Sequence, residues 1–96
     1  MADLRLISNH KREIEPLVKA ALDNEVRLLK TGIRQTQERL RKFEEKYHLS
    51  TQNFITRYEN DEFEETLEFA EWVGEYRMLE RLQEKAEALR GIRFAN

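Results

Sequence analysis

A run of mostly apolar residues, spaced alternately by four and by three, limits what this chain can fold into. Its members are Leu22, Val26, Leu29, Ile33, Thr36, Leu40, Phe43 and Tyr47. This spacing is the heptad repeat by which one helix packs along another. It predicts a helix over about residues 11–47, with Ser8 or Asn9 as its N-cap. Pro16 requires that the helix begin or bend near it, and Gly32 indicates a close contact or a weak point in mid-helix.

Two further helices are expected after the first. Ser50 is a suitable N-cap for a short helix over about residues 51–58. Asn60 or Asp61 is expected to cap a third helix over about residues 62–89, which Gly91 ends, leaving a short tail at 91–96. The third helix has one apolar stripe at helical spacing, formed by Phe69, Trp72, Tyr76, Leu79, Leu82, Ala86 and Leu89.

The two long helices are expected to pair antiparallel, because the connection between them is short and each apolar stripe needs a partner. The expected register places Phe43 beside Phe69 and Leu40 beside Trp72. We therefore predict an all-α fold, a long antiparallel helical hairpin with a short connecting helix, as a single domain over residues 1–96. Because one hairpin leaves much of each stripe in water, we also predict a homo-oligomer in which copies form a helical bundle.

Composition excludes several classes of protein. The chain has no cysteine, so it has neither disulfides nor a thiolate metal site, and a cytoplasmic location is expected. It has no apolar run of about 18 residues and no hydrophobic stretch near its start, so neither a membrane-spanning nor a secreted protein is expected. A net charge of −2 argues against a general nucleic-acid-binding protein.

Charge is distributed unevenly along the chain. Residues 59–75 contain eight acidic side chains and no basic one, whereas residues 11–48 have an excess of basic side chains. In the expected hairpin the acids lie beside five basic residues that neutralise part of their charge, namely Arg34, Arg39, Arg41, Lys42 and Lys46.

An acidic surface that contains aromatic residues suits a basic cleft on another protein, such as the RNA-binding cleft of a ribonuclease. We expect the partner-binding residues to be Glu62, Phe63, Glu64, Glu65, Glu68 and Trp72. The competing interpretation is that the acids form a solvated helix face and that Trp72 anchors the core.

Glu45 and His48 form a Glu-x-x-His pair, the spacing that carboxylate-bridged di-iron bundles use. A second copy would have to complete such a site with Glu71 or Glu75. Because the pair lies at a helix end in a chain rich in glutamate, we expect no metal and no other cofactor. The available Ser and Asp residues lie at expected helix ends, where they act as caps, and no Gly-rich phosphate loop is present. No catalytic site is therefore expected.

Two segments of the sequence resemble a known group of proteins. Phe43–Ser50 reads FEEKYHLS and is followed by Asn53-Phe54, and Glu71–Tyr76 reads EWVGEY. These segments are similar to ones in small helical bacterial and archaeal proteins that are the antitoxin-side partners in toxin–antitoxin operons. The similar part spans about residues 43–89, and His48 stands where that group usually has glycine. The resemblance implies a binding role without catalytic residues.

The sequence thus predicts a non-catalytic, antitoxin-like interaction module that sequesters a small basic protein, such as a toxin, and also binds a second copy of itself. Two alternatives remain open. One is a metal-binding helical bundle built on Glu45 and His48. The other is a structural or nucleic-acid-binding helical dimer.

Overall fold

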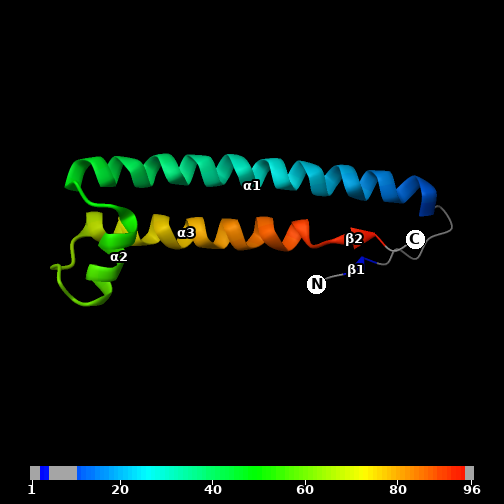
Figure 1. Cartoon of the computed structure of the whole chain (residues 1–96). Coiled ribbons are helices and arrows are strands. Elements are labelled where there is room, and N and C mark those ends of the chain that lie inside the picture. Colours follow the sequence, from blue (N-terminus) through cyan, green and yellow to red (C-terminus); the bar gives the residue numbers. More distant parts are fainter. Residues whose placement is uncertain (1–2, 5–10, 95–96) are drawn as a thin grey trace.

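The computed structural model describes residues 3–4 and 11–94, with side chains from Glu13 to Ile92. Within these residues the chain forms α1 (Lys11–Tyr47), α2 (Thr51–Glu59) and α3 (Leu67–Arg90). Two-residue strands, β1 (Asp3–Leu4) and β2 (Arg93–Phe94), pair in parallel. Figure 1 shows α1 and α3 running antiparallel, with α2 at the end where they are connected. The predicted all-α helical hairpin is confirmed.

The boundaries of α1 and α2 agree with the prediction, apart from one further residue at the end of α2. Ser50 caps α2 by accepting a hydrogen bond from the Asn53 backbone N–H. The expected caps Ser8 and Asn9 lie outside the described residues, as do the last two residues of the tail. Pro16 lies in the second turn of α1.

The third helix begins at Leu67, five residues later than expected, and residues 60–66 form a connector instead. Thr66 has extended backbone, and its hydroxyl accepts a hydrogen bond from the Phe69 N–H at 3.1 Å, so Thr66 rather than Asn60 or Asp61 is the N-cap. The rings of Phe63 and Phe69 meet with centroids 5.3 Å apart. On one continuous helix these two side chains would point about 120° apart, so their contact requires the break.

The expected register of the hairpin is wrong by about one turn of α3. Phe43 stacks on Trp72 with ring centroids 5.4 Å apart, and Phe69 packs against Tyr47 at 5.1 Å. The shift of α3 along α1 is possible because α3 starts at Leu67 and the Phe63 side chain turns back toward the core. The sequence indicated a close contact or a weak point at Gly32, but a Cβ atom there would lie 3.5 Å from Leu82 Cδ1, an ordinary van der Waals distance, so the packing does not require glycine.

The hydrophobic core lies at the closed end of the hairpin, where α2 packs against both long helices (Figure 1). Phe54 and Trp72 are fully buried and their rings stack at 3.8 Å, only 3° from parallel. Leu40, Ile55 and Val73 complete the buried cluster. The core therefore draws on all three helices.

A buried chain of hydrogen bonds crosses this core. The indole Nε1 of Trp72 donates to the hydroxyl of Thr51 at 3.0 Å. The backbone N–H of Thr51 donates in turn to the Glu44 carboxylate at 2.6 Å. These two hydrogen bonds connect α3 to α2 and α2 to α1. In the described part of the chain, every buried side-chain polar atom has a hydrogen-bond partner.

Toward the open end of the hairpin, beyond the aromatic cluster, fewer side chains are buried. Among the described residues there, Leu29, Thr36 and Ala86 are the buried ones. Thr36 satisfies its hydroxyl by donating to the Gly32 carbonyl at 2.8 Å. The described part of the open end therefore has only a narrow seam of buried side chains.

Replacing Thr51 by Val is expected to lower the free energy of unfolding by about 1–3 kcal/mol, because the buried indole N–H of Trp72 would lose its acceptor while the side-chain shape is kept. Chemical denaturation followed by Trp72 fluorescence measures this. Thr56→Val is the matched control, since the Thr56 hydroxyl is exposed and donates only to the Gln52 carbonyl. Equal effects of the two substitutions would contradict the buried hydrogen bond.

His48 ends α1 in the left-handed conformation, with φ of 52°, while the Leu49 N–H bonds to the Glu44 carbonyl. This is the position at which helices favour glycine. His48→Gly is therefore expected to stabilise the fold by about 1 kcal/mol, which raises the thermal midpoint by about 4–8 °C. His48→Ala keeps the Cβ atom and is expected to bring no such gain. Calorimetry that finds Gly and Ala equivalent would refute this account of the helix end.

Candidate partner-binding surface

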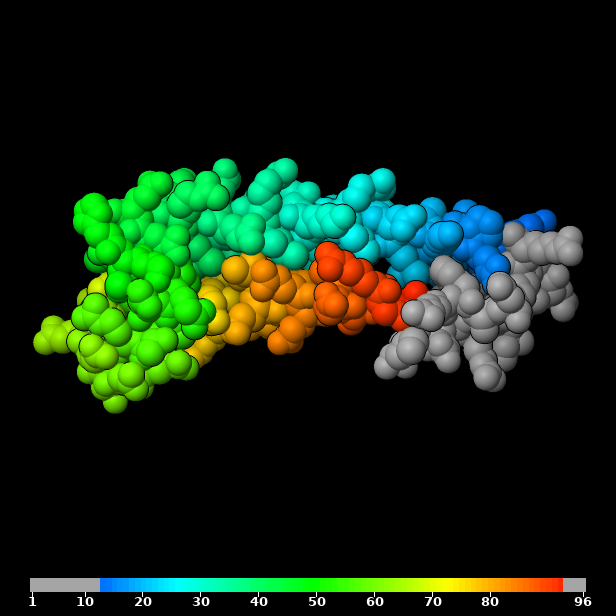
Figure 2. All heavy atoms as spheres, in the orientation of Figure 1, coloured from blue at the N-terminus to red at the C-terminus, as the bar shows by residue number. Residues whose placement is uncertain are grey.

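Seven of the 19 acidic residues lie together on one surface at the closed end of the molecule. We name this surface the acidic tip and define it as Glu59, Asp61, Glu62, Phe63, Glu64, Glu65, Glu68 and Glu71. These residues come from the end of α2, the connector and the first turns of α3. In Figure 2 the connector, drawn in yellow-green, protrudes at one end of the molecule.

Three carboxylates of the acidic run are paired with cations. Glu62 lies 3.2 Å from the Arg57 guanidinium. Two further pairs join α1 to α3 at 2.8 Å each, Lys46 with Glu68 and Arg39 with Glu75. Glu68 also accepts a hydrogen bond from the Tyr47 hydroxyl. Because these pairs are largely exposed, each adds little stability, and they serve mainly to align the two helices.

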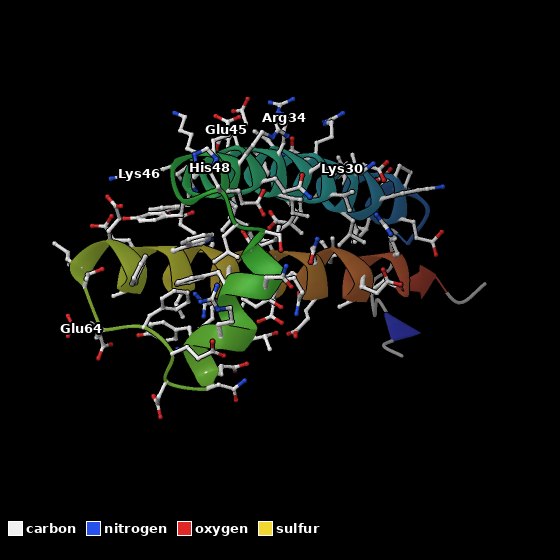
Figure 3. All side chains as sticks on the ribbon, turned by 60° about the vertical axis from the view of Figure 1, so that its left-hand side comes forward. Lys30, Arg34, Glu45, Lys46, His48 and Glu64 are labelled. Carbon is white, nitrogen blue, oxygen red and sulfur yellow. The ribbon has the colours of Figure 1, made fainter. Side chains whose placement is uncertain are left out.

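The other carboxylates of the tip have no basic partner. Glu59, Asp61, Glu64 and Glu71 are exposed, and their carboxylates form no hydrogen bond or ion pair with the residues that the structure describes. Figure 3 shows the Glu64 side chain extending from the connector into solvent. Glu65 accepts a hydrogen bond from the Tyr58 hydroxyl at 2.8 Å. That bond stabilises the protonated hydroxyl and so raises the pKa of Tyr58. The tip therefore keeps a surplus of negative charge.

Phe63 lies among these acids with part of its ring exposed. It packs on Phe54 and Phe69, with ring centroids 5.6 and 5.3 Å away, and the Arg57 guanidinium lies 4.7 Å from its ring centre. Beside it is a hollow of about 170 Å³ with mainly aromatic walls, lined by Tyr47, His48, Leu49, Phe54, Arg57, Phe63, Phe69 and Trp72. The tip thus combines exposed charge with a small apolar recess.

The structure brings five of the six predicted partner-binding residues together, namely Glu62, Phe63, Glu64, Glu65 and Glu68. Trp72 is fully buried and has no surface to offer a partner, in line with the competing interpretation that it anchors the core. The predicted set did not include Glu59, Asp61 and Glu71, which belong to the same acidic run and remain unpaired. Only the fold distinguishes them from the paired acids.

The basic residues expected to neutralise the acids do so only in part. Arg39 and Lys46 form the ion pairs described above. Arg34 lies farther along α1, where it lines a groove of about 430 Å³ together with Lys30, Gln83 and Arg90. Arg90 there is paired with Glu87 at 3.3 Å. Basic and acidic surfaces are therefore separated along the molecule.

Glu45 and His48 are both exposed at the end of α1 (Figure 3). Across the described side chains, no group of three or more His, Cys, Asp or Glu residues is arranged to hold a metal ion. Of the two residues expected to complete a site from a second copy, the Glu75 carboxylate is paired with Arg39, and Glu71 is exposed without a basic partner among the described residues. None of the helices in the described part of the chain combines the length and apolar character needed to cross a bilayer.

Comparison with known proteins identified no relative: no protein-family model, no curated protein and no solved structure matches this chain.

Proposed function

We propose that the chain is a non-catalytic binding module that holds a small basic protein on its acidic tip. The observation that carries this proposal is the surplus of exposed carboxylates without basic partners around a partly exposed aromatic ring. Because such charges repel one another, they add nothing to folding stability where they stand. A basic partner would supply the missing opposite charge.

The exposed carboxylates attract a basic partner before the two proteins touch. Their field extends over a Debye length of about 8–10 Å at physiological salt, so it raises the association rate with a basic surface more than it raises the final affinity. Glu59, Glu64 and Glu71 come from three successive elements of the tip, which spreads the field over its whole surface.

The recess beside Phe63 acts after contact. Its aromatic walls are fixed by the stacked core behind them, so little side-chain freedom is lost when a partner fills it. We expect the partner to insert one apolar side chain there, between its own basic residues. The charge then determines the association rate, and the recess determines the dissociation rate of the complex.

The resemblance to antitoxin-side proteins supports a toxin as the partner. A toxin that acts on RNA would need a cationic cleft to bind phosphate groups. An acidic tip seated in that cleft would occupy it and so block the activity. A gene for a small basic protein beside the gene for this chain would support this identity for the partner.

The first test removes unpaired charges and leaves every ion pair in place. Glu59→Gln, Glu64→Gln and Glu71→Gln in one chain are expected to slow association with the co-purified partner about tenfold at low salt. The effect should shrink as salt rises. The control removes three exposed acids elsewhere, with Asp23→Asn, Glu38→Gln and Glu84→Gln, and should change the association rate little. Surface plasmon resonance at two salt concentrations measures both.

The role of the acidic tip would be refuted if the association rate did not depend on salt concentration, or if the control variant slowed association as much as the tip variant. Circular dichroism of both variants establishes that the helices persist. No retained ion pair is broken by either variant, so a loss of binding cannot be attributed to a loosened hairpin.

The second test concerns the recess. Phe63→Ala is expected to raise the dissociation rate of the same complex about tenfold or more while leaving the association rate nearly unchanged, because an apolar contact forms after encounter. Phe63→Leu should recover much of the lost lifetime. If Phe63→Ala alters association alone, the recess does not hold the partner.

A further inference from the structure

The hairpin has two different faces. On one, α2 packs over the closed end (Figure 3), and two open grooves follow that face, lined by residues such as Gln37, Tyr76 and Gln83. The other face is defined by contacts between α1 and α3 that recur at intervals of seven residues. These are Lys46 with Glu68, Arg39 with Glu75, and Gly32 with Leu82. We name this second side the open face, because α2 does not cover it.

Large exposed apolar side chains are concentrated on the open face. Helical spacing places Leu28 next to Gly32 and Met78 next to Leu82 on this side. Leu28 is 59% exposed and Met78 is 41% exposed. Leu17 and Leu67, at 70% and 78%, lie three turns before Leu28 and Met78 and so border the same side. These four are the large apolar residues described as exposed.

The hairpin also exposes more surface than a compact chain of the same mass. The chain exposes 7668 Å², whereas a compact monomer of 11.6 kDa is expected to expose about 5,800 Å². Its radius of gyration is 18.9 Å, against about 12.5 Å for a compact chain of this length. The excess of about 1,800 Å² comes from the elongated shape, 60 × 22 × 18 Å, and is spread over all faces, of which a stable interface would need roughly 800 Å² per partner.

We infer that the open face binds a second copy of this chain in an antiparallel four-helix arrangement with two-fold symmetry. A second copy fits because it presents the same apolar stripe, and a two-fold interface brings a patch against itself. Two ion pairs lie at the seam of this face, Arg39 with Glu75 and Lys46 with Glu68, and both are formed within the chain.

The arrangement leaves the acidic tips free. Leu28, Gly32 and Leu82 lie on the part of the open face away from the closed end, whereas Leu67 lies at the start of α3, beside the tip. Copies that overlap there hold their acidic tips at opposite ends of the assembly, where mutual repulsion is smallest. Self-association at this part of the face leaves the unpaired carboxylates of the connector accessible, although Glu68 belongs both to the tip and to the open face.

The test compares two double variants with the same change in charge. Leu28→Glu with Met78→Glu places acids on the open face, and Gln37→Glu with Gln83→Glu places them on the side that carries the grooves. In sedimentation equilibrium at micromolar concentration, we expect wild type and the Gln variant to sediment as dimers. The Leu28/Met78 variant should sediment as a helical monomer, with the dissociation constant of the dimer raised at least 100-fold. A monomeric wild type, or a dimer disrupted only by the Gln variant, would overturn the proposal.

A second measurement does not depend on destabilising the chain. Because the protein has no cysteine, single cysteines can be placed one at a time without background. Gln35→Cys lies on the open face, seven residues from Leu28, and Gln37→Cys lies on the side with the grooves. A short bismaleimide should join Gln35→Cys chains, or Leu28→Cys chains, into covalent dimers much faster than Gln37→Cys chains. Equal rates at the two positions would also overturn the proposal.

Discussion

The stacked pair of Phe54 and Trp72 is the contact on which the rest of the structure depends. Each ring is fully buried, and together they bring α2 and α3 to a common centre. Phe43 stacks on the other side of the same cluster, which ties in α1. The hydrogen bond from Trp72 to Thr51 then fixes where α2 begins relative to α3. Aromatic stacking supplies burial without orienting the helices uniquely, and the buried polar contact supplies that orientation.

This cluster also determines where charge can gather. The core at the closed end holds eight of the nine aromatic side chains of the chain, and the acidic connector is attached to it through Phe63. Phe63 of the connector packs against Phe54 of this cluster, so the neighbouring acidic residues lie close to the cluster. The open end has only the narrow seam of Leu29, Thr36 and Ala86 and retains exposed apolar surface. One end is thus suited to a charged partner and the other to an apolar one.

The sequence predicted the helices better than their junctions. A heptad repeat extends over many residues, so it determined the limits of α1 and the existence of the hairpin. The start of α3 depended instead on whether Phe63 continued a helix or turned back to Phe54. No local pattern decides that, because Thr66 and Asp61 are both acceptable caps. The register error at Phe43 followed from the same junction. Likewise, sequence located the acidic run but did not separate Glu62, which Arg57 neutralises, from Glu64, which has no such partner.

The late start of α3 also bears on why the acids are there. If α3 had begun at Glu62, its first turns would hold four glutamates, and the helix dipole would account for them as stabilising residues. The observed helix begins at Leu67 and has a single acid, Glu68, in its first turn. Glu64 gains nothing from an ion pair within the described chain, and Glu62 needs Arg57 to offset its charge. Folding thus explains Glu68 and Glu75, which align α1 with α3, but leaves the charge of Glu59, Asp61, Glu64 and Glu71 without a structural role. The proposed binding role would use the charge of those four residues, and this charge is independent of the forces that hold the hairpin together.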